Sequence, residues 1–230
     1  MYKKKSLFVT FEGIEGSGKS YQAYKLYKKL KNKKFSVLLT REPGGTENAE
    51  KIRDVILDDY FHKNINKKFN KYTDTLLYLA ARNEHILNKI NPAINKKKIV
   101  ICDRFIDSTT AYQVYGKSVN KNFVNSLHKY ILKGLKPDLT FLLTVKISKA
   151  MNRLNKRKKK NRYDKFSKAF YSNVQKAFIK IAKTNKRKYE ILDNSTDSSN
   201  VEKIIYDKLI NKLKKWKRRI FILPLLYIIP

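Results

Sequence analysis

A glycine-rich octapeptide near the start of the chain limits the folds that this sequence can adopt. Gly13-Ile14-Glu15-Gly16-Ser17-Gly18-Lys19-Ser20 fits the pattern G-x-x-x-x-G-K-[ST], and it lies between an apolar run and a helical pattern. In such a loop, backbone N–H groups surround phosphate oxygens, Lys19 reaches the outer phosphates, and Ser20 can hold Mg²⁺. A glycine turn with a chance Lys-Ser pair is the alternative, but the order strand, loop, helix favours a nucleotide-binding loop.

Five short apolar runs, separated by longer helix-compatible stretches, indicate the fold class. The expected strands are Leu7 to Phe11, Ser36 to Thr40, Ile99 to Cys102, Leu139 to Val145 and Tyr189 to Leu192. The expected helices follow Lys19, cover about 47–58, carry Leu76 to Leu87, and cover about 120–132, 165–183 and 201–213. Strands that alternate with helices and are almost entirely apolar predict an α/β domain whose parallel sheet is covered by helices on both faces. We place this single domain at residues 1–215.

The net charge of +34, from 53 Lys and Arg against 19 Asp and Glu, would attract any polyanion at low salt. A nucleic-acid footprint should cluster on one face, whereas lysine occurs throughout this chain beside abundant Asn, Ile and Tyr. We therefore read the charge as a composition bias over the whole chain. No specific nucleic-acid partner is expected.

The remaining composition bears on the cellular compartment. Cys102 is the single cysteine, which excludes an intramolecular disulfide framework and favours a reducing compartment. No apolar run reaches the roughly 20 residues that a membrane-spanning helix needs, and the first residues lead into a strand and not a signal peptide. We expect a cytoplasmic protein without a membrane span.

Two further loops follow expected strands, which is where parallel sheets bind their ligands. The second strand ends in TREPGGT at 40–46, and the third ends in CDRFIDSTTAYQ at 102–113. Further motifs are LLYLAAR at 76–82, PDLTFLLTV at 137–145 and NRYD at 161–164. Together with the phosphate loop and in this order, these motifs resemble the bacterial thymidylate kinases from about Leu7 to Leu213.

The resemblance implies a three-layer P-loop NTPase fold with a short basic lid. It also implies a homodimeric kinase that uses Mg²⁺ and transfers the γ-phosphoryl group of ATP to dTMP, giving dTDP and ADP for dTTP biosynthesis. Phosphoryl transfer depends on alignment and charge neutralisation, which cations at these loops would supply. Another nucleoside monophosphate kinase is the nearest alternative, and a basic nucleic-acid-binding P-loop ATPase is a more distant one.

For the phosphates, the resemblance implies catalytic roles for two cations. Lys19 would bridge the β- and γ-phosphates, and Arg104 would hold the acceptor phosphate, with Arg53 as a second phosphate-binding arginine. Arginine suits this task because its guanidinium is a bidentate fork. Ser20 and Asp103 are the metal candidates, although Asp103 could instead orient Arg104.

For the nucleoside, the resemblance implies contacts from three segments. Tyr78 lies where the family usually has a Phe that stacks on thymine, and Arg82 would point toward O4 of the base. An ordinary amphipathic helix with a core Tyr and a solvated Arg is the alternative for these two residues. The other implied contacts are Thr109 and Gln113 at the base, Tyr112 against a ribose 2′-OH, and Glu15 at the 3′-OH.

A basic run follows the fourth expected strand. Eight Lys or Arg residues lie between Lys146 and Lys160, and no acidic residue occurs between Asp138 and Asp164. In isolation, such a run would indicate a solvated or nucleic-acid-binding tract. Its position after the strand favours a lid over the triphosphate, at about 150–164.

Lid arginines would supply charge that the phosphate loop lacks. Some family members carry an arginine in that loop, where this chain has Gly16. Arg157 and Arg162 match lid arginines of the bacterial type and are expected to be catalytic, with Arg153 a weaker candidate. Adenine contacts are expected from the lid and from 193–195.

The last residues, 216–230, lie outside the resemblance. A basic stretch is followed by an 11-residue apolar run with two prolines, which is too short for a spanning helix. This extension could be a packed strand or cap, an interfacial anchor, or dispensable, and we favour the first or the last. Removal of 217–230 is expected to leave activity intact.

Overall fold

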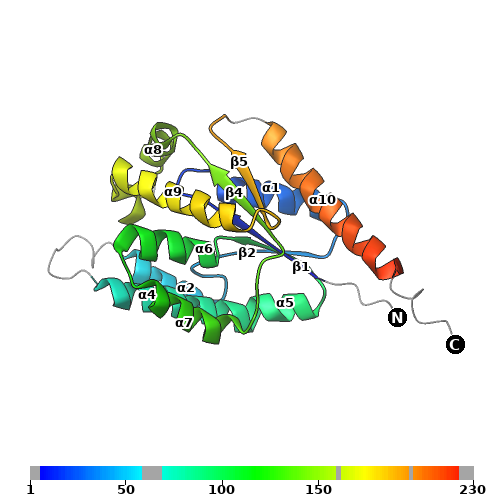
Figure 1. Cartoon of the computed structure of the whole chain (residues 1–230), viewed down its shortest axis with the longest axis horizontal. Coiled ribbons are helices and arrows are strands. Elements are labelled where there is room, and N and C mark those ends of the chain that lie inside the picture. The colour runs from blue at the N-terminus through cyan, green and yellow to red at the C-terminus, as the bar shows by residue number, and fades with distance from the viewer. Residues whose placement is uncertain (1–5, 59–68, 159–161, 197–198, 223–230) are drawn as a thin grey trace.

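The computed structural model describes residues 6–58, 69–158, 162–196 and 199–222, whose arrangement is shown in Figure 1. Its centre is a sheet of five parallel strands in the order β2-β3-β1-β4-β5. The strands are β1 (Leu7–Glu12), β2 (Val37–Arg41), β3 (Ile99–Asp103), β4 (Leu139–Thr144) and β5 (Tyr189–Asp193). The predicted α/β class with a five-stranded parallel sheet is therefore confirmed.

The central strands are apolar on both sides because helices cover both faces of the sheet. All six residues of β1 are buried, and Phe11 lies opposite Asp103 of β3 and Phe141 of β4. Since the strands are parallel, their carboxyl ends meet at one edge of the sheet. Side chains that follow β1, β2 and β3 are thereby brought close together.

Two helices, α1 (Lys19–Asn32) and α10 (Ser199–Ile222), cover one face of the sheet (Figure 1). Their buried apolar residues against that face are Ala23, Leu26 and Leu30 of α1 and Val201, Ile205 and Leu209 of α10. Because α1 begins directly after Gly18, its free backbone N–H groups face the phosphate loop.

A larger set of helical segments covers the opposite face (Figure 1). They include α4 (Lys71–His85), which continues through the π-helical η2 (Ile86–Ile90) into α5 (Asn91–Asn95). The set also includes α6 (Ile106–Thr109), the π-helical η3 (Thr110–Gly116), α7 (Lys121–Leu132) and α9 (Lys168–Thr184). Two further helices pack on this layer, α2 (Glu47–Leu57) on α4 and α8 (Ile147–Asn155) on α9, and the 3₁₀ turn η4 (Arg162–Lys165) precedes α9. The molecule thus has the expected three layers.

One helix lies where the sequence indicated only a basic lid. α8 buries Ala150 and Leu154, and Ile147 and Met151 pack on the same apolar cluster. These four residues have the i, i+3, i+4, i+7 spacing of an amphipathic helix, which the surrounding lysines and arginines mask in the composition. Residues 159–161 of the expected lid lie outside the described residues.

The C-terminal helix extends beyond the expected end of the domain. α10 continues through residue 215 to Ile222, so the basic stretch at 216–219 is helical. Residues 223–230 of the apolar run lie outside the described residues. In the described part of the chain, no helix has both the length and the apolar character needed to cross a membrane.

Candidate active site

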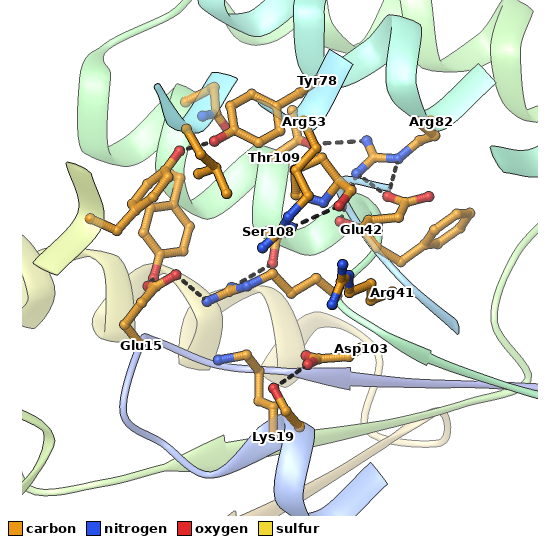
Figure 2. A pocket seen from close by; sticks show the side chains of 18 of the residues that line it. Glu15, Lys19, Arg41, Glu42, Arg53, Tyr78, Arg82, Asp103, Ser108 and Thr109 are labelled. Atoms are coloured by element: carbon orange, nitrogen blue, oxygen red, sulfur yellow. Dashed lines mark hydrogen bonds and ion pairs between the residues drawn. The ribbon is translucent and has the colours of Figure 1, made fainter. Parts of the chain in front are cut away.

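A cavity of about 200 Å³ lies at the carboxyl edge of the sheet, beside the phosphate loop. The expected site residues that line it are Glu15, Lys19, Ser20, Arg53, Tyr78, Arg82, Asp103, Arg104, Thr109, Tyr112, Gln113 and Arg157. In Figure 2, Lys19 and Asp103 lie at one end, and Tyr78, Arg82 and Thr109 lie at the other. Residues from distant parts of the sequence therefore share one cavity.

Two glycines of the phosphate loop are required by close backbone contacts. Gly13 has φ +138°, and a Cβ there would lie 2.3 Å from the backbone oxygen of Leu143. Gly16 has φ +72°, and a Cβ there would lie 2.7 Å from the backbone oxygen of Ala150 in α8. A side chain at position 16 would therefore require α8 to move, which accounts for glycine in place of arginine there.

The Lys19 ammonium folds back onto the phosphate loop. Its Nζ donates to the backbone oxygen of Ile14 at 2.6 Å and lies 3.4 Å from the Ser17 hydroxyl. Burial and the nearby Arg104 guanidinium lower the pKa of Lys19 to about 8, against the opposing effect of nearby carboxylates. A phosphate in the loop would favour the charged ammonium, because an opposite charge stabilises it.

Ser20 and Asp103 offer oxygen atoms to a cation. The Ser20 hydroxyl donates to Asp103 Oδ2, and the buried Asp103 Oδ1 has no hydrogen-bond partner among the described residues. The described residues contain no cluster of three or more His, Cys, Asp or Glu that could hold a metal. One hydroxyl and one carboxylate nevertheless fit Mg²⁺, which usually keeps several waters and completes its shell with substrate phosphates.

Arg104 and Glu15 form an ion pair in the middle of the cavity. Arg104 Nη2 lies 2.6 Å from Glu15 Oε1, and the Tyr112 hydroxyl donates to the other carboxylate oxygen. Burial raises the pKa of Glu15, but Arg104 and Lys19 outweigh this effect and hold it below its usual value. Arg104 has the left-handed φ of 70°, uncommon for a residue with a side chain, and also donates to Ser108 Oγ at 2.9 Å.

Glu12, at the end of β1, supports the loop that carries Arg104. Its carboxylate accepts from the backbone N–H of Phe105 at 2.8 Å and from the Ser108 hydroxyl at 2.6 Å. Burial and the nearby Asp107 carboxylate raise the pKa of Glu12 to about 7. The loop after β3 is thus fastened to a carboxyl group that titrates near neutral pH.

Arg82 is held by protein groups on all its nitrogen atoms. Its Nε donates to Glu42 at 2.7 Å, Nη1 contacts Thr109 Oγ1 and His128 Nε2 at 2.8 Å, and Nη2 donates to the Phe105 backbone oxygen at 2.9 Å. Partners therefore come from the loop after β2, the loop after β3, α6 and α7. The guanidinium is fixed at the nucleoside end of the cavity.

Two buried histidines complete this network. Because arginine has no acceptor, His128 Nε2 must accept from Arg82, so the ring is neutral with its proton on Nδ1. Burial and the Arg82 charge lower the pKa of His128 to about 3. His85 contacts Glu42 Oε1 at 3.1 Å and Thr40 Oγ1 at 2.6 Å. The network links α4 and α7 to the edge of the sheet.

The three arginines of the expected lid occupy different places. Arg157 lines the cavity. Arg153 donates to the backbone oxygens of Gly16 at 2.8 Å and Asn194 at 3.0 Å, so it ties α8 to the phosphate loop. Arg162 lies apart from the cavity lining, with Nη2 2.5 Å from Asp74 Oδ1 of α4. Arg157 therefore lines the cavity, whereas Arg162 belongs to a buried ion pair.

Comparison with known proteins places this arrangement in a family. The family model for thymidylate kinase matches residues 11–205. This chain belongs to the thymidylate kinase family. The thymidylate kinase of Mycoplasma capricolum subsp. capricolum is 38% identical over 215 residues, which is 93% of this chain and 99% of the relative. That of Acholeplasma laidlawii is 38% identical over 209 residues, covering 90% and 100%.

A solved structure agrees with this placement. The crystal structure of thymidylate kinase from Ehrlichia chaffeensis superposes with a TM-score of 0.69 at 32% identity, covering 90% of this chain and 99% of that one. The predicted family, P-loop fold and nucleoside monophosphate kinase class are therefore confirmed. The roles of individual residues of this chain remain predictions.

Sequence reasoning missed several groups that shape the site of this chain. Arg41, Glu42, Ser108 and Tyr163 also line the cavity. Each lies inside a motif that the sequence analysis identified. For Arg41, Glu42 and Ser108, the position at or shortly after the end of a strand was an available signal. For His128, in contrast, we find no local pattern that would have indicated contact with Arg82.

Proposed function

We propose that this chain transfers the γ-phosphoryl group of ATP to dTMP, with dTDP and ADP as products, in dTTP biosynthesis. The observation that best supports the proposal is one cavity that joins a phosphate loop, with Lys19, to a nucleoside end with Tyr78 and Arg82 (Figure 2). Phosphoryl transfer requires donor and acceptor to be held in line. A single cavity with a phosphate-binding end and a nucleoside-binding end could hold the donor and the acceptor in this way.

The cations of the cavity would neutralise the phosphates. Lys19 would contact the β- and γ-phosphates, and Arg104 would hold the acceptor phosphate, with Arg53 beside it. Arg104 is already oriented by Glu15 and Ser108, so little reorganisation would be needed when charge develops. We propose Arg157 as the basic-run arginine that acts on the transferred group.

We propose that Ser20 and Asp103 hold Mg²⁺. When bound, the ion supplies neutralisation of phosphate charge. The unpartnered Asp103 Oδ1 supports this role. Asp103 Oδ1 would accept a hydrogen bond from a metal-bound water or bind the ion directly. If Asp103 only oriented Arg104, this oxygen atom would have no role.

The nucleoside end fits a pyrimidine base. Tyr78 offers an aromatic plate, and Gln113 Nε2, which has no hydrogen-bond partner among the described residues, would donate to a base carbonyl. Arg82 would reach O4 by redirecting an N–H that it now gives to Thr109 or His128. The base would therefore compete with protein acceptors for this guanidinium.

Tyr112 and Glu15 would contact the sugar. The Glu15 carboxylate would accept the 3′-OH, and the Tyr112 ring would lie where a 2′-OH would project. Since Glu15 also pairs with Arg104, one connected set of side chains would hold the sugar and its phosphate. This set would favour a deoxynucleotide.

We propose a homodimer in which an apolar stripe on α4 and η2 is covered by a second copy. Tyr72, Leu76, Ala80 and Leu87 are exposed and recur at helical spacing. Leu76→Asp should convert dimer to monomer in light scattering. An unchanged mass for this variant would exclude the stripe as the subunit contact.

The deciding experiment is a coupled ADP-release assay with Mg-ATP and dTMP, dUMP, UMP, CMP, AMP or GMP, with and without DNA. We expect strong preference for dTMP and no effect of DNA. Preference for another monophosphate would replace dTMP as the substrate, and turnover that rises only with DNA would overturn the kinase proposal. Cytoplasmic location and the absence of a nucleic-acid partner remain predictions.

A further inference from the structure

Five residues form a connected group at the nucleoside end of the cavity, and the proposed chemistry uses only Tyr78 among them. We call Asp74, Tyr78, Lys117, Arg162 and Tyr163 the η4 cluster, because η4 supplies two of them. Its ion pairs are short, with Arg162 Nη2 2.5 Å from Asp74 Oδ1 and Lys117 Nζ 2.7 Å from Asp74 Oδ2. The Arg162 and Asp74 side chains are only 4% and 2% exposed.

Hydrogen bonds connect this buried ion pair to the cavity wall. The hydroxyls of Tyr78 and Tyr163 contact each other, and Arg162 Nη2 lies 3.0 Å from the first and 3.1 Å from the second. Both tyrosines line the cavity, whereas Arg162 does not. The Tyr78 ring, which Figure 2 shows at the nucleoside end, is thus fixed at its hydroxyl by groups from η4.

Tyr163 also contacts the wall that would face the sugar. Its ring meets that of Tyr112 edge-on, with centroids 5.6 Å apart and planes at 88°. Its backbone oxygen accepts from the Tyr171 hydroxyl of α9. Tyr163 therefore lies between the two aromatic rings of the acceptor site and is itself anchored to the helix behind.

A hydroxyl at position 78 is a departure from the Phe that the family resemblance leads us to expect. A buried hydroxyl without a partner would destabilise the site, and here Tyr163 and Arg162 supply the partners. Desolvation, Tyr163 and the Asp74 carboxylate raise the pKa of Tyr78 well above its usual value, against the opposing effect of Arg162, so the phenol stays protonated and can donate.

We propose that Arg162 and Tyr163 are positioning residues for the acceptor nucleoside, which set the plane of Tyr78, and that Arg162 does not act on the transferred phosphoryl group. This inference rests on the proposed function, because it assumes that the base of dTMP stacks on the Tyr78 ring. Asp74 fixes the Arg162 guanidinium through an ion pair at Oδ1, and Lys117 forms an ion pair with Oδ2 of the same carboxylate.

The test separates KM from kcat in a matched set of variants. Tyr78→Phe and Tyr163→Phe keep both rings and should each raise KM for dTMP about 3- to 10-fold with kcat changed less than about 3-fold, since the hydroxyls act equally in ground and transition states. The double variant should lose less than the sum of the two single losses, because each single variant already removes the contact between the two hydroxyls. Tyr130→Phe, an exposed α7 hydroxyl, serves as the control.

Arg162→Ala and Asp74→Asn distinguish positioning from catalysis. Positioning predicts that both weaken dTMP binding in calorimetry without ATP, and that both raise KM for dTMP far more than they lower kcat. A loss of about 100-fold or more in kcat for Arg162→Ala, with unchanged dTMP affinity, would overturn the inference. Additive effects of the two phenylalanine variants would also overturn it.

Failure of the proposed function would look different. In that case the wild-type protein itself would neither bind nor phosphorylate dTMP. Failure of the inference alone would leave wild-type dTMP kinase activity intact while the variants kept wild-type dTMP affinity.

Discussion

Arg82 and Glu42 form an ion pair inside the protein, with Nη2 and Oε2 2.7 Å apart and the side chains 3% and 4% exposed. Arg82 belongs to α4 and Glu42 to the loop after β2, so the pair fastens a helical wall of the cavity to the edge of the sheet. Removing one member of a buried pair leaves an uncompensated charge, which is more destabilising than the pair itself is stabilising.

Glu42→Gln should therefore lower the free energy of unfolding by about 3–5 kcal/mol, measured by urea denaturation. The matched control is Glu47→Gln, which breaks an exposed pair with Lys51 whose side chains are 71% and 84% exposed. The control should change stability by less than about 1 kcal/mol. Equally small losses of unfolding free energy in the two variants would show that the buried pair contributes no more to stability than the exposed pair.

The lowered pKa of Lys19 predicts a pH effect on ATP binding. With a pKa of about 8, the free protein loses the Lys19 charge as pH rises through 8, whereas bound phosphate restores it. ATP binding should therefore take up a proton above pH 8 and weaken with rising pH. Calorimetry in two buffers of different ionisation enthalpy measures the uptake, and Lys19→Arg, which stays charged, should abolish it. Identical uptake in that variant would assign the proton to another group.

The raised pKa of Glu12 predicts a pH effect on stability. Its usual value is 4.5 and its folded value about 7, so between these values the folded protein binds more protons than the unfolded chain. The contribution of Glu12 to stability therefore falls as pH rises through this window, by on the order of 3 kcal/mol. Urea denaturation at several pH values should show this fall in wild type relative to Glu12→Gln. Parallel curves for the two proteins would contradict the assignment.

Arg157→Ala should lower kcat by about 100-fold or more while changing KM for dTMP little, because its charge is needed as the phosphoryl group moves. Steady-state kinetics with saturating ATP measures both constants. Lys129→Ala, an exposed α7 residue, removes one positive charge away from the cavity and is the control. A comparable loss in the control would point to overall charge and not to Arg157.

Local patterns were sufficient for the sheet and for the phosphate loop. Each strand is a short apolar run, and the phosphate loop is a pattern of eight consecutive residues, Gly13 to Ser20. Such features depend on a few neighbouring residues, so the sequence displays them directly. The α8 helix was missed although its apolar residues have helical spacing, because charged residues dominate that part of the chain.

The sequence by itself determined the fold class, the loop that would receive phosphate, and most of the residues around the cavity. Only the tertiary structure decided which charges meet, as in Arg162 with Asp74 and Arg82 with His128, and which carboxyl groups are desolvated, as in Glu12. The physical reason is that strand and turn patterns are local, whereas ion pairing and burial depend on how elements distant in sequence pack together.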